Sequence, residues 1–481
     1  MSIKATLPIG EEMQAATKVE LPAGAPARVS EALGRREMNV AVLKTKAEQA
    51  LTETFAAIAD KLPGGAATLK HREEAIGRFS ALGLPHRRIE AWKYTDLRNL
   101  MKEALPPSVV VSVPVSAKQL DEVLGPLAKL EATRVVFVDG FYAEALSDTR
   151  SVPGLAVMAL RHALQSEDDL LEIEGAKDEP IVALNTAYVT DGAVIAIADK
   201  AKLDKPLLIV NVSASPEPRL LATRNVVAVG ARAHATIIEA FAMLPGAATE
   251  PQASALTEID LGTDAQASHV KCVLGTGRAT HLANWLVGIG ERADYRGFQF
   301  TSGVALARNQ LALTFKGQGA KIDLSGAFLA QGHEHIDTTL VVDHAVPGCT
   351  SRELFKGVLA DEARGIFQGK VIVRPDAQKT DGKQMAKVLM LSPNAEFDSK
   401  PELEIFADDV VCGHGSTSAD LDQDLLFYCQ SRGIPEQEAR ALLIESFIGD
   451  AIAKVEREDV RDALAALARK WLDDLPPAAR A

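Results

Sequence analysis

Cysteine is scarce in this chain of 481 residues, which contains four: Cys272, Cys349, Cys412 and Cys429. No two of them form a C-x-x-C pair, so neither a zinc finger nor a disulfide-stabilised secreted scaffold is favoured. Free thiols are typical of a reducing compartment. Residues 1–25 mix acidic and basic side chains and do not resemble a signal peptide. We therefore expect a cytoplasmic protein.

Long apolar runs and clusters of basic residues are also missing. No stretch of about 18 apolar residues occurs, so we expect no membrane-spanning helix and no membrane partner. The formal net charge is −13, and no run of Lys and Arg provides the basic surface of a nucleic-acid binder. We expect no nucleic-acid partner, and the acidic balance mainly serves solubility.

Several catalytic signatures are absent. Nothing matches the Walker A pattern G-x-x-x-x-G-K-[ST], the G-x-S-x-G elbow or the H-E-x-x-H motif. These absences argue against an ATPase, an α/β-hydrolase and a zincin. Aromatic residues make up only 5% of the chain although 47% is hydrophobic, so we expect a core of small aliphatic side chains.

Helical periodicity marks the first part of the chain. Leu51, Phe55, Ile58 and Leu62 recur at spacings of four, three and four residues, which places them on one face of a helix. The Pro-Gly-Gly sequence at 63–65 ends that helix. The N-terminal region is therefore predicted to be helical.

From about residue 130 the pattern changes to short β-branched runs separated by Gly, Asp and Pro, which predicts strands. A G-x-x-A motif recurs at 230–233, 262–265, 290–293 and 317–320, with spacings of 32, 28 and 27 residues. Periods of roughly 20–50 residues are typical of solenoids. A parallel β-helix fits, because each coil would bury its small aliphatic residues against the next. A β-sandwich remains the alternative on these patterns alone.

After about residue 415 the helical period returns. Pro435, Glu436 and Glu438 make a favourable first turn, because the proline ring fits there and carboxylates suit the positive end of the helix dipole. A broad apolar face follows: Leu442, Leu443, Phe447, Ile448, Ile452 and Val455. Such a face is typical of a helix buried against its own core, or of one that docks on a partner.

Three histidines form the first candidate site. His333 and His335 would face the same side of a strand, and His344 would supply a third imidazole. Three imidazoles are a suitable ligand set for a transition metal. A metal-dependent, cupin-like enzyme is therefore one hypothesis. The alternative is that these histidines are polar side chains on a solenoid surface.

Cys412 and His414 form the second candidate site. They would also share one face of a strand. A thiolate and an imidazole together can hold iron or a sulfur intermediate. On spacing alone such a pair is a weak signal, and the alternative is a purely structural role, as in most such pairs.

Longer stretches resemble a known family. Residues 401–417 read PELEIFADDVVCGHGST, residues 426–434 read LFYCQSRGI, and residues 90–95 read EAWKYT. These segments resemble the SufB/SufD family of iron–sulfur cluster assembly proteins, and specifically its SufD branch. Shorter matches lie at 342–345, 349–351, 356–358 and 367–370. Val411 and Gly413 stand where a basic residue and a serine are usual in the family.

The resemblance implies an architecture. It predicts a mainly β protein with a right-handed parallel β-helix core at residues 126–415. An N-terminal helical domain with a linker would occupy residues 1–125, and a C-terminal helical domain residues 416–481.

The resemblance also implies a function. The chain would be a non-catalytic scaffold subunit in a complex with SufB and the ATPase SufC. His414 and Cys412 would lie at the interface with SufB, with His414 as a transient ligand of iron. The residues implied in SufC docking are Arg440, Leu443, Ile444, Phe447 and Ile448.

Cofactors and assembly follow from the same resemblance. The chain alone would hold no tightly bound cofactor, and the nascent iron–sulfur cluster would be shared with SufB. A flavin on the complex, and a homodimer of the chain expressed alone, are compatible with this prediction.

Overall fold

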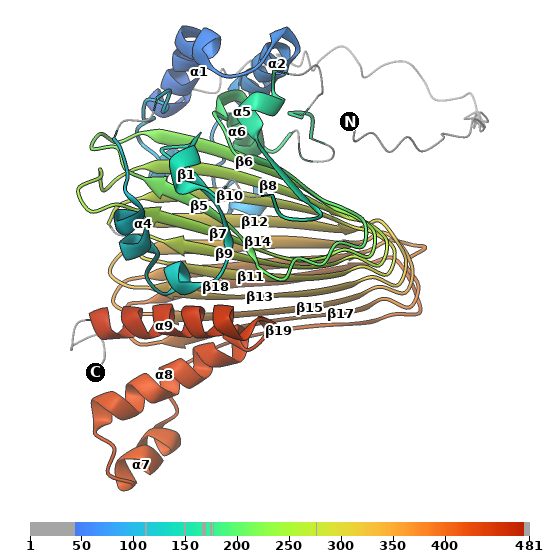
Figure 1. The fold of residues 1–481 in the computed structure, drawn as a ribbon. Coiled ribbons are helices and arrows are strands. Elements are labelled where there is room, and N and C mark those ends of the chain that lie inside the picture. The colour runs from blue at the N-terminus through green and yellow to red at the C-terminus, as the bar shows by residue number, and fades with distance from the viewer. Residues whose placement is uncertain are drawn as a thin grey trace, which may run out of the picture. The chain divides into compact units, whose positions relative to one another are not determined.

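Two parallel β-sheets run side by side through the chain and form the body of the molecule (Figure 1). The computed structural model describes residues 44–475, apart from 111–112, 149–150, 166–169, 174–175, 177 and 276. The described part forms one compact unit.

Odd-numbered strands dominate one sheet and even-numbered strands the other. The ten-stranded sheet in the described residues contains β1 (Thr133–Val138), β2 (Phe141–Tyr142), β5 (Leu207–Ser213), β7 (His234–Met243), β9 (Gln266–Leu274), β11 (Asp294–Ser302), β13 (Lys321–Ala330), β15 (Thr350–Leu359), β17 (Asp381–Met390) and β19 (Val411–Ala419). The nine-stranded sheet contains β3 (Leu155–Ala159), β4 (Ala193–Ile197), β6 (Leu220–Val229), β8 (Gln252–Leu261), β10 (Thr280–Ile289), β12 (Leu306–Phe315), β14 (His335–His344), β16 (Arg364–Val373) and β18 (Glu396–Ile405).

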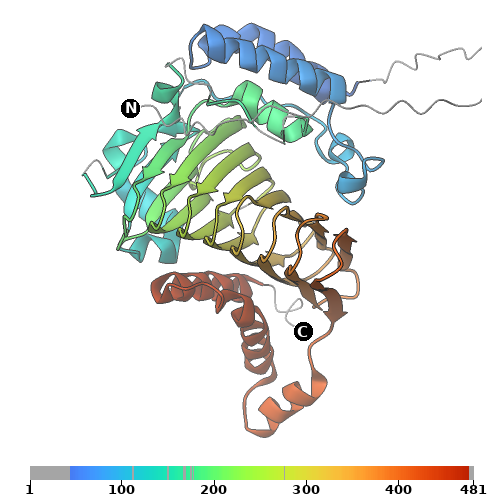
Figure 2. The ribbon, with the colours of Figure 1, turned by 90° about the vertical axis from the view of Figure 1, so that its right-hand side faces the viewer.

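From β4 onward the chain alternates between the two sheets, so each coil consists of one strand from each. Every strand from β6 to β17 pairs in parallel with the strands two before and two after it, as in the register Thr280↔Leu306. Figure 2 shows the coils stacked one after another. The predicted parallel β-helix is confirmed, and a sandwich of antiparallel sheets is excluded.

The G-x-x-A motif forms the turn that leads into strands of the ten-stranded sheet. Its third residue has a positive φ: 59° at Arg232, 57° at Asp264 and 54° at Arg292. The amide of that residue donates to a carbonyl in the turn of the next coil, for example Arg232 N–H to Thr263 O at 2.9 Å. The final alanine points inward and is fully buried, as at Ala293. The repeat is therefore the sequence signature of a stack of turns.

Glycine opens the motif because neighbouring turns approach closely. A Cβ at Gly262 would lie 2.8 Å from the backbone nitrogen of Ala231 in the preceding turn. Real Cβ atoms essentially never come that close, so only glycine fits without a shift of the backbone.

Helices precede the β-helix, as predicted. They are α1 (Lys46–Ile58), η1 (Ala59–Lys61), α2 (Ala66–Leu82), η2 (Glu90–Trp92), α3 (Leu97–Leu100), α4 (Ala117–Leu124) and η3 (Gly125–Lys129). Leu51, Phe55 and Leu62, from the predicted apolar face, are buried in one cluster with outward-facing residues of the nine-stranded sheet such as Leu220 and Leu282.

Short helices also interrupt the region predicted to be only strands. They are η4 (Glu144–Leu146), α5 (Leu160–Ala163) and α6 (Pro180–Tyr188). Every residue of α6 from Ile181 to Tyr188 is buried, because the helix lies between α2 and the nine-stranded sheet. A helix buried on all sides has no apolar stripe along a single face, which explains why periodicity did not reveal α6.

The C-terminal helices are α7 (Gln423–Ser431), α8 (Glu436–Ile452) and α9 (Glu458–Asp474). α8 and α9 bury apolar residues, including Ile448 and Leu464, against the outer face of the ten-stranded sheet. α7 packs on α8 and extends away from the sheets (Figures 1 and 2). We keep the predicted three-part division at residues 125 and 415 as a proposal. No helix among the described residues is both long and apolar enough to span a lipid bilayer.

Candidate functional site at the open end of the β-helix

The last coil leaves one edge of each sheet uncovered. Within the described residues, β18 pairs only with β16 and β19 only with β17, so the outer edge of each has free backbone donors and acceptors. Apolar side chains are exposed beside these edges, with Phe406 61% and Val411 60% accessible. We call this end of the β-helix, from β18 through β19, the open rim. It is an unfinished surface of the kind that pairs with another chain.

Cys412 and His414 lie on β19 at this rim. β19 pairs with β17 in the register Gly382↔Cys412 and Gln384↔His414. Because Gln384 is buried inside the coil, strand alternation turns Cys412 and His414 toward the same interior. The shared face expected from the sequence is thus consistent with the strand geometry. A functional role for the two residues stays a prediction.

The two side chains differ in exposure. His414 is exposed, whereas Cys412 is half-buried and packs against the interior core cluster. Burial raises the pKa of the Cys412 thiol, and the negative charge of Asp381 raises it further. The sulfur is therefore a neutral thiol near pH 7 and would need a bound metal to become a thiolate ligand.

A column of polar residues continues from His414 into the interior. Glu353 on β15 pairs in register with Gln384 on β17, which pairs in turn with His414. The Gln384 side chain crosses the coil, because its Nε2 donates to the carbonyl oxygens of Gly369 at 3.3 Å and Glu402 at 3.1 Å on the opposite sheet. The Gln384 side chain therefore spans the interior of the β-helix directly beneath the rim.

Glu353 lies below the Gln384 side chain and is 3% exposed. Ser351, two residues earlier on β15, hydrogen-bonds to its carboxyl group, and Gln384 Oε1 lacks a hydrogen-bond partner among the described residues. Burial raises the pKa of Glu353 to about 8, so the carboxyl is largely neutral at pH 7. Sequence reasoning missed this column, although polar residues at alternate positions of apolar strands were a visible signal.

The three-histidine metal site is wrong. His333 lies in the turn before β14 rather than in a strand, and its 83% exposed side chain pairs with Glu362 at 3.4 Å. His335 begins β14 and His344 ends it, so about 30 Å separates them at 3.3 Å per residue. No group of three His, Cys, Asp or Glu side chains in the described part of the chain could hold a metal ion.

His335 and His344 have structural partners instead. His335 Nε2 lies 2.9 Å from Thr95 Oγ1, and His344 Nε2 lies 3.0 Å from Ser351 Oγ. Burial lowers the pKa of both imidazoles to about 4, so both are neutral near pH 7. The cupin-like hypothesis thus has no ligand set.

The segment at 90–95 attaches the N-terminal region to the nine-stranded sheet. The Trp92 ring stacks on the Arg308 guanidinium at 3.8 Å, and Arg308 forms a buried ion pair with Asp337. Thr95 donates a hydrogen bond to the same Asp337. This family-like segment therefore has a packing role here.

The residues expected to dock a partner divide into two groups. Ile444 and Ile448 are buried against the ten-stranded sheet, and Leu443 and Phe447 are half-buried on the same cluster. Arg440 is half-buried and pairs with Glu436 at 3.2 Å. The apolar face of α8 is therefore mostly occupied by the protein's own core.

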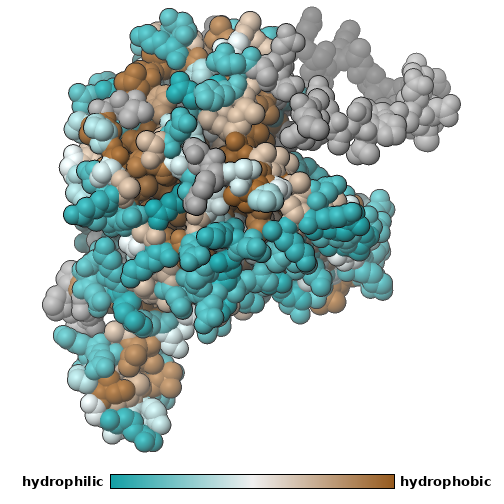
Figure 3. Space-filling view, viewed as in Figure 1, coloured by the Kyte–Doolittle hydropathy of each residue, from teal (hydrophilic) through white to brown (hydrophobic). Residues whose placement is uncertain are grey.

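A different apolar surface is exposed nearby. Leu425, Phe427 and Tyr428 on α7 and Leu442 on α8 are 51%, 71%, 56% and 45% accessible. We call these four residues the α7–α8 patch. Figure 3 shows hydrophobic residues gathered on the projecting helices at the lower end of the molecule. The sequence motif at 426–434 covers part of this patch. The motif indicated the family but assigned no role to these residues.

These features define a class of protein: a parallel β-helix with an unfinished rim and a projecting helical pair, built for assembly with other chains. Comparison with known proteins identifies the family. Residues 45–209 match the SufBD protein N-terminal region, and residues 211–447 match the SufBD core domain of SUF system FeS cluster assembly. The chain belongs to the SufBD family of the SUF iron–sulfur cluster assembly system.

Relatives from several bacteria agree with this assignment. An iron–sulfur cluster assembly SufBD family protein of Synechocystis is 31% identical over 80% of this chain and 86% of its own length. The iron–sulfur cluster assembly protein SufD of Escherichia coli is 29% identical over 82% and 90%, respectively. SufD of Bacillus subtilis is 25% identical over 66% and 74%. The resemblance found in the sequence is thereby confirmed.

Proposed function

We propose that this chain is a non-catalytic scaffold subunit that joins a SufB-type subunit through the open rim. The observation that carries this proposal is the pair of uncovered strands β18 and β19 beside exposed Phe406 and Val411. A partner that continues either sheet would satisfy the free backbone groups and cover the apolar side chains.

Cys412 and His414 lie where such a partner would meet this chain. Two side chains are too few to hold an iron–sulfur cluster, which ordinarily takes four protein ligands. A cluster assembled at the rim would therefore need donors from the partner, and this chain alone would retain no cluster. In this proposal iron is cargo, His414 binds it transiently, and Cys412 has the smaller role.

The α7–α8 patch supports a second contact, with a SufC-type ATPase. Three of its four exposed apolar residues lie on α7, which extends away from the sheets (Figure 2), and the fourth lies on α8. Ile444, Ile448 and Phe447 support α8 from beneath, so they would position this surface rather than form it. ATP hydrolysis would take place on the partner.

Co-purification tests the rim. The chain is co-expressed with SufB and SufC subunits from one organism, and Phe406→Asp is compared with wild type. In the joined interface the aspartate would be buried without compensation. Phe406→Asp should therefore abolish capture of SufB and leave capture of SufC intact. Met158→Asp is a matched control, because Met158 is 51% exposed on β3, at the opposite edge of the nine-stranded sheet.

Full retention of SufB by Phe406→Asp would contradict the proposal. The same variant also tests self-association, because a homodimer of the chain expressed alone would use the rim and should become a monomer in light scattering.

A further inference from the structure

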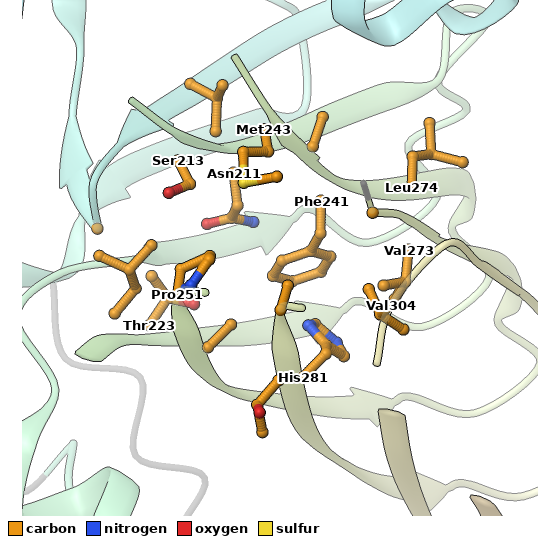
Figure 4. A pocket seen from close by; sticks show the side chains of 18 residues that line it. Asn211, Ser213, Thr223, Phe241, Met243, Pro251, Val273, Leu274, His281 and Val304 are labelled. Atoms are coloured by element: carbon orange, nitrogen blue, oxygen red, sulfur yellow. The ribbon is translucent and has the colours of Figure 1, made fainter. Parts of the chain in front are cut away.

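The interior cavity of the first coils has room for water but not for a larger ligand. Figure 4 shows Asn211, Phe241 and His281 among the side chains that line it. Its volume is about 60 Å³, enough for a few water molecules. Such waters suit the buried amide of Asn211 and Nε2 of His281, which have no hydrogen-bond partner in the described part of the chain.

A larger cavity lies outside the β-helix, at the start of α2. Its volume is about 260 Å³, which is ample for a small ion. Its walls are the end of η1, the Pro-Gly-Gly loop at 63–65 and the first two turns of α2, as far as Arg72. Because Gly64 and Gly65 have no side chains, this loop leaves the beginning of the helix open to the cavity.

The first turn of α2 offers backbone donors at this place. The earliest hydrogen bond of the helix runs from the Leu69 amide to the carbonyl of Gly65, at 3.0 Å. The amides of Ala66, Ala67 and Thr68 have no acceptor among the described residues, and Gly65 provides no side-chain cap. Such amides, at the positive end of the helix dipole, favour a negative charge.

Arg72 adds a full positive charge beside these amides. It lies one turn beyond Thr68 on the same face of α2, and helical side chains lean toward the N-terminus. Its Nη2 donates to the carbonyl of Pro63 at 2.9 Å and its Nη1 to that of Ala187 at 2.9 Å, so the guanidinium lies at the first turn, in the wall of the cavity. Its Nε has no acceptor in the described part of the chain, although Arg72 is only 1% exposed.

The charge of Arg72 is not compensated by the protein. Among the residues that the structure describes, no carboxylate forms an ion pair with Arg72, and the nearby Arg224 is itself paired with Glu258. Burial and the charge of Arg224 lower the pKa of Arg72 to about 9, which still leaves the guanidinium protonated at pH 7. The carboxylate in the lining, Asp60, is exposed to water. Buried charges are normally paired, so this cavity is suited to an anion.

We propose that this cavity binds a small tetrahedral oxyanion, namely phosphate, either free or as the phosphate group of a larger molecule. Its several oxygens accept from the converging amides of the first turn, and its charge compensates that of the Arg72 guanidinium. The site lies among the N-terminal helices, is separate from the rim and does not depend on the scaffold function.

Inorganic phosphate, glycerol 2-phosphate and acetate are suitable probes, titrated into the full chain by calorimetry at constant ionic strength. Acetate should bind at least about tenfold more weakly than phosphate, because it brings less charge and fewer acceptor oxygens to the same donors. Tighter binding of glycerol 2-phosphate than of phosphate would identify a phosphate ester as the ligand, and weaker binding would identify free phosphate.

Ala66→Asp tests the site without altering Arg72. Ala66 is exposed at the first helical position, where a carboxylate suits the helix dipole, so the variant should fold. Its charge should weaken phosphate binding at least about tenfold by repulsion. Ala81→Asp is the matched control, because it adds the same charge at an exposed position in the last turn of α2 and should leave binding unchanged. Asp60→Asn should strengthen binding about threefold, since it removes a repelling charge from the cavity wall.

Arg72→Met should abolish phosphate binding, and thermal melting verifies that the variant is folded. If it does not fold, the comparison of Ala66→Asp with Ala81→Asp decides the question. Three results would overturn the proposal: neither heat nor a rise in melting temperature with phosphate up to about 10 mM, equal binding by the wild type and Ala66→Asp, or equal weakening by Ala66→Asp and Ala81→Asp.

Discussion

His414 is the residue whose loss should separate assembly from cluster formation. Its exposed imidazole at the rim can ligate iron through a neutral nitrogen, which alanine cannot do. We predict that His414→Ala leaves the complex with SufB and SufC intact but removes most of its iron and acid-labile sulfide. Cys412→Ser should have a milder effect, because Cys412 packs partly as a small apolar side chain.

His333→Ala is the matched control, since His333 is also exposed but lies outside the rim. Normal iron and sulfide in the His414→Ala complex, with a loss in the His333→Ala complex, would reverse the assignment of the site.

Glu353 should make stability depend on pH. Its folded pKa of about 8 lies above the ordinary value of 4.5, so its contribution is fully present below about pH 4.5. That contribution is lost as the pH rises to about 8, because the unfolded chain releases this proton while the folded protein keeps it until its own pKa is reached. Glu353→Gln keeps a neutral side chain of similar shape throughout.

We therefore expect Glu353→Gln and wild type to be similar in stability near pH 5. Near pH 9 the variant should be more stable, by up to about 3–5 kcal/mol for a shift of this size. Urea unfolding at both pH values measures the difference. A gap that stays constant with pH would show that Glu353 is ionised, or solvated, in the folded state.

At the scale of the element, the α7–α8 patch is the surface on which a docking partner can be tested cleanly. Phe427 is 71% exposed, so Phe427→Glu should leave folding unchanged. In a joined interface the glutamate would become buried and desolvated, so capture of SufC should be lost. Co-purification with SufC, together with a melting curve of the isolated chain, measures both effects.

Ile448→Glu provides the contrast, because Ile448 is 2% exposed within the core cluster and a charge there should unfold the helix from the sheet. Phe447→Glu should be intermediate, since Phe447 is half-buried and Lys356 Nζ lies 4.3 Å from its ring centre. Unimpaired SufC capture by folded Phe427→Glu would place the docking surface elsewhere.

The close approach of the stacked turns is a second feature whose effect on stability can be measured. A Cβ at Gly317 would collide with the backbone nitrogen and Cα of Glu291 in the preceding turn. Gly317→Ala should therefore destabilise the protein by about 1–3 kcal/mol, as overpacking usually does. The midpoint of urea unfolding reports the change.

Gly413→Ala is the control for that substitution, because a Cβ there would meet no atom within 4 Å. Gly413 lies on the edge strand β19, where an added methyl group faces open space. Equal destabilisation by both variants would contradict the explanation that close approach of the turns governs the cost.

At the scale of the whole molecule, the two ends of the β-helix differ. At one end, the antiparallel strands β2 and β3 finish the two sheets. At the other end, β18 and β19 continue the parallel pairing and have no further neighbour among the described residues. Parallel stacking propagates indefinitely unless something stops it, so in the proposed function the polarity of the molecule would direct assembly to the rim.

The sequence patterns by themselves determined a long strand region with a recurring turn, the flanking helices and the common face of Cys412 and His414, while the choice of a parallel β-helix over a β-sandwich rested on the family resemblance. Each depends on local periodicity: the turn repeat recurs once per coil, and alternation along one strand needs no knowledge of its neighbours. The family resemblance rested on contiguous segments and held for the same reason.

Only the tertiary structure decided which faces are covered. It placed His333 in a turn and separated His335 from His344 by the length of β14. It buried the apolar face of α8 and exposed Phe427 instead. Periodicity tells that a helix or strand has an apolar side, but burial depends on residues distant in sequence that arrive against it. The polar column of Glu353, Gln384 and His414 exists only because three strands about 30 residues apart stack in register.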